Sequence, residues 1–151
     1  MSQQVWVTAN SHLVNVRQFG VSFPGVFDYL AFYPLDRKKK QERTDAEQAE
    51  WLSMMQACVK ISKQYNNFKK LDPAIIPTTL YGHNIRTDIE LPAFCSTEGG
   101  GGIIFLNEQC AALLKQFRLG ETVMYPVSFF DVDHHQLVND QRYYILNLSS
   151  G

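Results

Sequence analysis

The chain has 151 residues, of which 45% are apolar, 13% aromatic and 19% charged, and its formal net charge is −1 at neutral pH. This length and composition fit one globular domain that buries a core without disulfides or metals, and they exclude a disordered chain. The near-zero charge gives no basic field for phosphates, so nucleic-acid binding is disfavoured and any such contact would be local.

The amino-terminal residues 1–7 lack the basic start and the apolar stretch of a secretion signal, and no segment is long and apolar enough to cross a bilayer. We therefore expect a cytoplasmic protein without membrane contacts. The three cysteines, Cys58, Cys95 and Cys110, are widely spaced and include no Cys-x-x-Cys pair. This pattern indicates reduced thiols and neither a disulfide framework nor a zinc site.

The first third of the chain is predicted to be mostly extended. Residues 5–7 and 13–16 are short, valine-containing runs typical of strands. The aromatic-rich segment 26–33 has a proline on either side, which favours a strand or a buried loop. Residues 37–43 form a charged run, interpreted as a solvated loop because positive charge just before a helix opposes its macrodipole.

A long amphipathic helix is predicted over about 45–66. Thr44 and Glu47 fit a capping box, in which the threonine hydroxyl accepts the Glu47 N–H and the glutamate carboxylate reaches back. Apolar residues then recur at spacings of three and four, which is the period of one helix face. They are Trp51, Met54, Met55, Cys58, Ile61 and Tyr65.

Residues 71–102 carry weaker signals. Two prolines make 71–77 a connector, and 78–81 is predicted to be a short strand that Gly82 stops. The four consecutive glycines of 99–102 have the greatest backbone freedom in the chain. We therefore predict a mobile loop over 96–102.

The last fifty residues show a clear strand–helix–strand–strand order. The apolar run 103–106 predicts a strand, and Asn107 is placed to cap a helix over about 107–118. The apolar residues of that helix fall on one face, and Gly120 stands where a left-handed residue would end it. The face consists of Cys110, Leu113, Leu114 and Phe117.

Two strands and a polar turn follow. The β-rich run 123–130 is interrupted by Pro126, which cannot donate a ladder hydrogen bond, so this strand should be an edge or carry a bulge there. The polar segment 131–136 makes the turn. Residues 142–148 form the closing strand, and apolar groups on both of its faces indicate a central position. Together these elements predict a single α+β domain over 1–151, with a mainly antiparallel sheet and both helices packed on it.

The candidate chemistry is sparse. Asp131, Asp133, His134 and His135 form the one cluster of metal-ligand types, but adjacent histidines in a strand or turn point apart. A solvated turn is therefore favoured over a metal site. Cys95 is expected in a loop, with His83 twelve residues away as its nearest potential base, which is a weak case for a nucleophile. No cofactor is expected, because the glycines lack the following Lys-Ser or Lys-Thr of a phosphate-binding loop and lead into a strand.

A family resemblance rests on segment 92–148. Its features are a Pro-x-Phe that begins at Pro92, an apolar strand, the helix opening on Asn107, Tyr-Pro-Val at 125–127, and the final Tyr-Tyr-Ile-Leu-Asn at 143–147. The segment resembles the carboxy-terminal part of a bacterial immunity-protein family, long catalogued as a domain of unknown function. Such proteins are encoded beside toxins of polymorphic or contact-dependent secretion systems. The resemblance implies binding and neutralisation of a cognate toxin or effector in the cytoplasm.

The leading hypothesis is thus an immunity-type protein without enzymatic activity, whose partner is a toxin encoded nearby. The candidate contact residues are Asp131, Asp133, His134 and His135 in the turn, together with Glu98 in the loop 96–102. A second hypothesis is an enzyme or small-ligand binder that uses the four turn residues around a metal. A third is a structural or adaptor module, such as a homodimer formed through a strand edge near Pro126.

Overall fold

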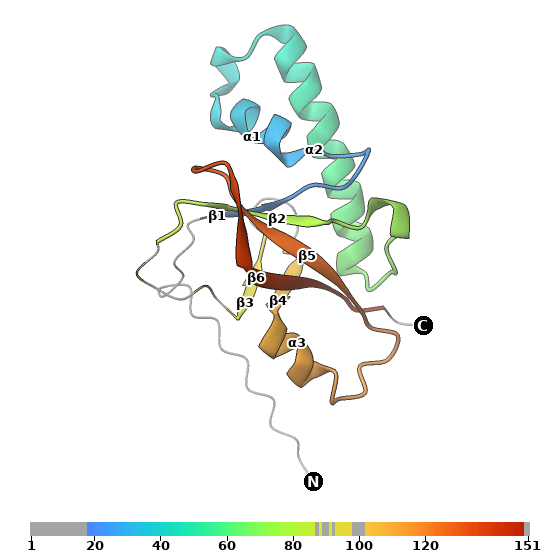
Figure 1. Cartoon of the computed structure of the whole chain (residues 1–151). Helices are drawn as coiled ribbons and strands as arrows, with labels where there is room; N and C mark the ends of the chain where they lie inside the picture. The colour runs from blue at the N-terminus through green and yellow to red at the C-terminus, as the bar shows by residue number, and fades with distance from the viewer. Residues whose placement is uncertain (1–17, 87, 89–90, 92, 98–101, 150–151) are drawn as a thin grey trace.

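The computed structural model describes residues 18–86, 88, 91, 93–97 and 102–149, with the side chains of 139–141 left out. Within them lies one six-stranded sheet in the order β1-β2-β5-β6-β4-β3 (Figure 1). The strands are β1 (Gln18–Val21), β2 (Thr79–His83), β3 (Phe94–Ser96), β4 (Ile104–Asn107), β5 (Val123–Asp131) and β6 (Gln136–Asn147). The helices are α1 (Tyr29–Arg37), α2 (Asp45–Asn66) and α3 (Glu108–Leu114), with short 3₁₀ turns at Lys40–Glu42 and Pro73–Ile75.

All neighbouring strands of this sheet pair antiparallel except β2 and β5, which are parallel. The predicted α+β fold with a mainly antiparallel sheet is confirmed. In Figure 1, α1 and the start of α2 lie at one end of the molecule and α3 at the other, with the twisted sheet between them. The strands predicted at 5–7 and 13–16 lie outside the described residues.

The prediction of a strand or buried loop at 26–33 is wrong, because residues 29–37 form helix α1. Asp28 caps it, and its carboxylate accepts the N–H of Leu30 at 3.0 Å. Pro34 lies inside the helix and does not bound it. The hydrogen bond that Pro34 cannot donate would end at the carbonyl of Leu30, and Leu30 is exposed, so water can reach that carbonyl.

Helix α2 is confirmed from Asp45 to Asn66. The Thr44 hydroxyl accepts the Glu47 N–H at 3.1 Å, and the Glu47 carboxylate accepts the Thr44 N–H at 3.0 Å. The carboxy-terminal half of α2 buries Cys58, Ile61 and Tyr65 in the main core. The amino-terminal half extends past the sheet and carries α1 beside it (Figure 1). The charged run before α2 is the end of α1 and a 3₁₀ turn.

Strand β6 is central, as predicted, because it pairs with β5 on one side and β4 on the other. Tyr143 and Ile145 point into the main core, which also contains the buried side chains of α2. Tyr144 and Leu146 point to the other face, where a smaller apolar cluster packs against α3. Alternate side chains of β6 therefore contribute to two separate cores.

The shorter helix begins as predicted, since the Asn107 side chain accepts the Cys110 N–H at 2.9 Å. It ends earlier than predicted, at Leu114, and Lys115 is the residue that follows it. Gly120 has a φ of +66° but lies in the next loop, so it does not terminate the helix. Phe117 is 61% exposed. The sequence predicted four more helical residues, 115–118, from their apolar spacing. Beyond Leu114 this apolar face does not pack on the sheet, so the helix ends there.

Pro126 lies where β5 is flanked by β6 alone, because β2 pairs only with 128–131. The Ser128 N–H donates to the Thr78 carbonyl at 2.9 Å. The nitrogen of position 126, two residues earlier, faces the same side, where β2 has ended, so proline breaks no ladder there. The irregularity in the β5–β6 register lies between Ser128 and Phe130. The prediction that this strand is an edge or carries a bulge at Pro126 is therefore wrong: β5 lies between β2 and β6, it lacks a second neighbour only before Ser128, and its irregularity lies further along the strand.

The hydroxyl of Tyr65 bridges two strands of the sheet. The β4–β6 register pairs Phe105 with Ile145, so the next pair would be Ile104 and Leu146. The Tyr65 hydroxyl lies between these two residues: it accepts the Ile104 N–H at 3.0 Å and donates to the Leu146 carbonyl at 2.5 Å. Helix α2 is thereby bonded to β4 and β6 at the point where the pairing between these two strands stops.

Candidate functional site

The predicted turn is present between β5 and β6 and spans residues 132–135. Asp131, the last residue of β5, is 7% exposed. One of its carboxylate oxygens accepts the backbone N–H of His134 at 3.1 Å, and the other lies 2.8 Å from His134 Nδ1. Asp131 therefore holds the turn from inside, while the His134 side chain is 66% exposed.

Contacts with other residues also hold Asp133 and His135, the remaining two candidate residues of the turn. The Asp133 carboxylate accepts the backbone N–H of Asn84, which follows β2, so the turn is tied to the neighbouring strand. His135 adopts a φ of +50°, and its ring meets that of Phe130 edge-on with centroids 5.3 Å apart. The turn is thus held at two points by hydrogen bonds and presents Asp133, His134 and His135 to solvent.

The structure gives the metal hypothesis no support. In the part of the chain that it describes, no three His, Cys, Asp or Glu side chains are placed to hold a metal ion. Of the predicted candidates, the turn residues lie together, whereas Glu98 lies outside the described residues. The glycines 99–101 lie outside them as well.

His83 is the buried histidine next to this turn. It lies at the end of β2 and is 3% exposed. Its Nε2 is 2.8 Å from the Tyr29 hydroxyl, and the Tyr33 ring stacks on it with centroids 4.1 Å apart. Burial lowers the pKa of His83 below its ordinary value of 6.5, against the opposing effect of the Asp133 carboxylate. His83 is therefore neutral at neutral pH, and sequence reasoning missed its role as a packing centre for two tyrosines.

The expected placement of Cys95 in a loop is wrong. Cys95 lies in β3, and three strands separate β3 from the β2 strand that carries His83. Burial raises the pKa of the Cys95 thiol to about 12, so the thiolate is absent at neutral pH. Cys58 is also buried, whereas Cys110 is half-buried and lies in α3.

The lowered pKa of His83 predicts that the protein loses stability as the pH falls. The unfolded chain takes up the proton near the ordinary value, whereas the folded chain takes it up only at lower pH. The stabilising contribution is thus complete above about pH 6.5 and is lost as the pH falls through the folded-state pKa. Urea unfolding between about pH 7.5 and 5.5 measures it. His83→Gln keeps an acceptor for Tyr29 and cannot titrate, so its stability should vary less over this range; an equal slope would contradict the prediction.

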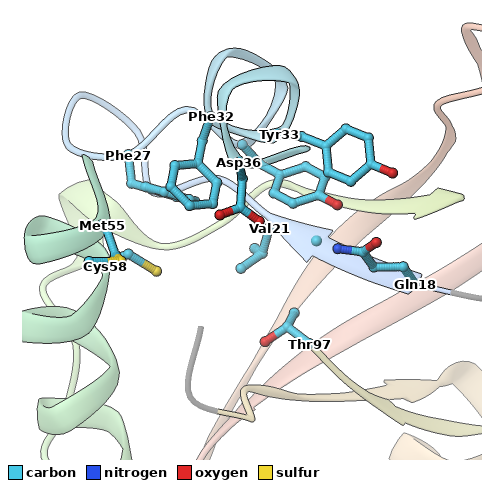
Figure 2. A pocket seen from close by; sticks show the side chains of 11 residues that line it. Gln18, Val21, Phe27, Phe32, Tyr33, Asp36, Met55, Cys58 and Thr97 are labelled. Carbon is cyan, nitrogen blue, oxygen red and sulfur yellow. The ribbon is translucent and has the colours of Figure 1, made fainter. Parts of the chain in front are cut away.

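A cavity lies between α1, β1 and α2. Its volume is about 250 Å³, and we call it the α1 cavity (Figure 2). Its lining residues are Gln18, Gly20, Val21, Phe27, Tyr29, Phe32, Tyr33, Asp36, Met55, Cys58 and Thr97. Sequence reasoning missed it because the walls come from four separate segments. The available signal was the helical spacing of Tyr29, Phe32, Tyr33 and Asp36 within the segment interpreted as extended.

Comparisons with known proteins found no match to any family model, curated protein or solved structure. Among the described residues, no helix has the length and apolar character needed to span a membrane.

Proposed function

We propose that this protein works in the cytoplasm by binding another protein, and that its partner is a toxin or effector encoded beside it. The observation that supports this proposal best is the turn 132–135. Asp131 and Asn84 hold it in place through side-chain to backbone hydrogen bonds, and three polar side chains project from it.

A pre-organised turn favours protein recognition because little conformational entropy is lost when a partner binds. The turn connects two strands of nine and twelve residues, so it stands on a stiff base. Its exposed groups are one carboxylate and two imidazoles, which donate and accept hydrogen bonds at the rim of an interface. The resemblance of segment 92–148 to immunity proteins supports the same class of partner.

The experiment is co-expression of the chain with the product of the adjacent gene, followed by pull-down and a growth-rescue assay. We expect a stable complex and restored growth. The double variant His134→Ala, His135→Asn should weaken the complex at least about tenfold, the effect of losing one strong interface contact. Asparagine is used at 135 because it tolerates the positive φ found there.

The control is Phe117→Ala, which removes a 61% exposed ring next to α3 and leaves the turn unchanged. It should bind the toxin as the wild type does. If the Phe117 variant loses binding and the turn variant does not, the contact surface is at α3 and the assignment to the turn is wrong. If no complex forms and growth is not rescued, the immunity proposal fails.

A further inference from the structure

We propose that the α1 cavity binds a small organic cation, an alkylated amine whose charged nitrogen faces Asp36. This site is separate from the turn 132–135 and does not depend on the protein-binding proposal. The cavity walls, the single carboxylate among them and the cavity volume favour this ligand.

The walls are largely aromatic. Tyr29, Phe32, Tyr33 and Asp36 are spaced i, i+3, i+4 and i+7, so they share one face of α1. Phe27 adds a further ring, with its centroid 5.1 Å from that of Phe32. In the view of Figure 2 the Asp36 carboxylate points away from the helix, with the Phe27 and Phe32 rings on one side and the Tyr33 ring on the other. The helix therefore brings several rings and one carboxylate to the same space.

Among the described residues that line the cavity, Asp36 is the one with a carboxylate side chain, and none is a lysine or arginine. Burial raises the pKa of the Cys58 thiol, so this lining group stays neutral. One oxygen of Asp36 accepts the Trp51 indole N–H at 2.9 Å, which orients the carboxylate. The nearby Arg43 does not line the cavity: its guanidinium donates to the Leu35 carbonyl at 2.7 Å and lies 4.3 Å from the Trp51 ring centroid.

These features favour a ligand that is positively charged and small. Aromatic faces attract cations, most strongly when the cation leaves water, and rings around a quaternary ammonium are a recurrent arrangement. A carboxylate repels anions and gains nothing from a neutral apolar ligand. The volume of about 250 Å³ is below the roughly 300 Å³ at which pockets for drug-sized ligands begin. A small alkylated amine satisfies all three conditions.

The first measurement compares choline with its neutral analogue 3,3-dimethyl-1-butanol, in which a quaternary carbon replaces the nitrogen. The two molecules have nearly the same shape, so their difference reports the charge alone. Titration of the wild-type protein, followed by calorimetry and by tryptophan fluorescence, should show saturable choline binding. The neutral analogue should bind at least about tenfold more weakly, because it has no charge to interact with the aromatic rings or with the Asp36 carboxylate.

Variants then locate the site. Asp36→Asn keeps an acceptor for the Trp51 N–H and removes the charge, so choline should bind about tenfold more weakly and the neutral analogue equally well. Phe32→Leu should weaken choline binding about fivefold. The matched control Glu108→Gln removes a carboxylate from α3, at the far end of the molecule in Figure 1, and should leave choline affinity unchanged.

Three results would overturn the proposal: no saturable binding of choline to the folded wild-type protein, equal affinity for the two probes, or an Asp36→Asn protein that binds choline normally. Circular dichroism and a melting curve establish that each variant is folded. If Asp36→Asn does not fold, the comparison of the two probes on the wild type and the Phe32→Leu titration still decide the question.

Discussion

Gly20→Ala is expected to lower the free energy of unfolding by about 3 kcal/mol, the upper end of the usual cost of overpacking a core. A Cβ atom at position 20 would lie far inside van der Waals contact with the Tyr29 ring. That ring cannot move freely, because it is buried, stacks on Tyr81 and has its hydroxyl 2.8 Å from His83 Nε2. Accommodating one methyl group therefore requires α1 to shift away from β1.

A double-mutant cycle with Tyr29→Ala tests the cause. Tyr29→Ala alone should be destabilising, but it makes room for the new Cβ, so adding Gly20→Ala should then cost less than about 1 kcal/mol. Urea denaturation of the four proteins measures the cycle. If Gly20→Ala costs the same in both backgrounds, the contact with Tyr29 is not the reason for the loss.

The second large effect is expected for Tyr65→Phe, which should lower the free energy of unfolding by about 3 kcal/mol. Removing the hydroxyl leaves the Ile104 N–H and the Leu146 carbonyl without their bridge, in a region where Tyr65 is buried. Each unsatisfied buried backbone group costs about 1–3 kcal/mol, and the two strands cannot close the gap without moving α2.

The matched control is Tyr125→Phe. Tyr125 is a half-buried tyrosine of β5 whose hydroxyl makes no hydrogen bond to the described residues. The same atom is deleted, yet the change in stability should stay below about 0.5 kcal/mol. Chemical denaturation of both variants gives the comparison. Equal losses would show that the Tyr65 bridge is not what makes its hydroxyl important.

The sequence predicted elements whose signals are local. The capping box of Thr44 and Glu47 and the periodic apolar residues of α2 lie within one helix, so they define it without the rest of the chain. Helix α1 was missed because its nine residues give only one full repeat of the pattern, and because Pro34 inside it resembles a boundary. The Leu30 carbonyl that loses its partner to Pro34 belongs to an exposed residue, and this exposure cannot be read from the sequence.

Pairings between distant segments could not be predicted from the sequence. His83 and Cys95 are twelve residues apart yet lie on strands that three others separate, and β2 pairs in parallel with β5 across some forty intervening residues. The turn 131–135 was located because polar residues between two strands are a local signal. The sequence did not predict that Asp131 is buried, nor did it predict the α1 cavity, because both depend on groups that only the fold brings together.

The Tyr65 bridge also bears on when the chain folds during synthesis. Helix α2 has all of its capping and periodic signals within residues 44–66, so it can form soon after it leaves the ribosome. The Tyr65 hydroxyl of this helix has both of its hydrogen-bond partners only when Leu146, 81 residues further along the chain, has emerged. Contacts of such sequence separation form late, because the intervening loop must close first. The docking of α2, and with it completion of the main core, is therefore deferred until almost the whole domain has been translated.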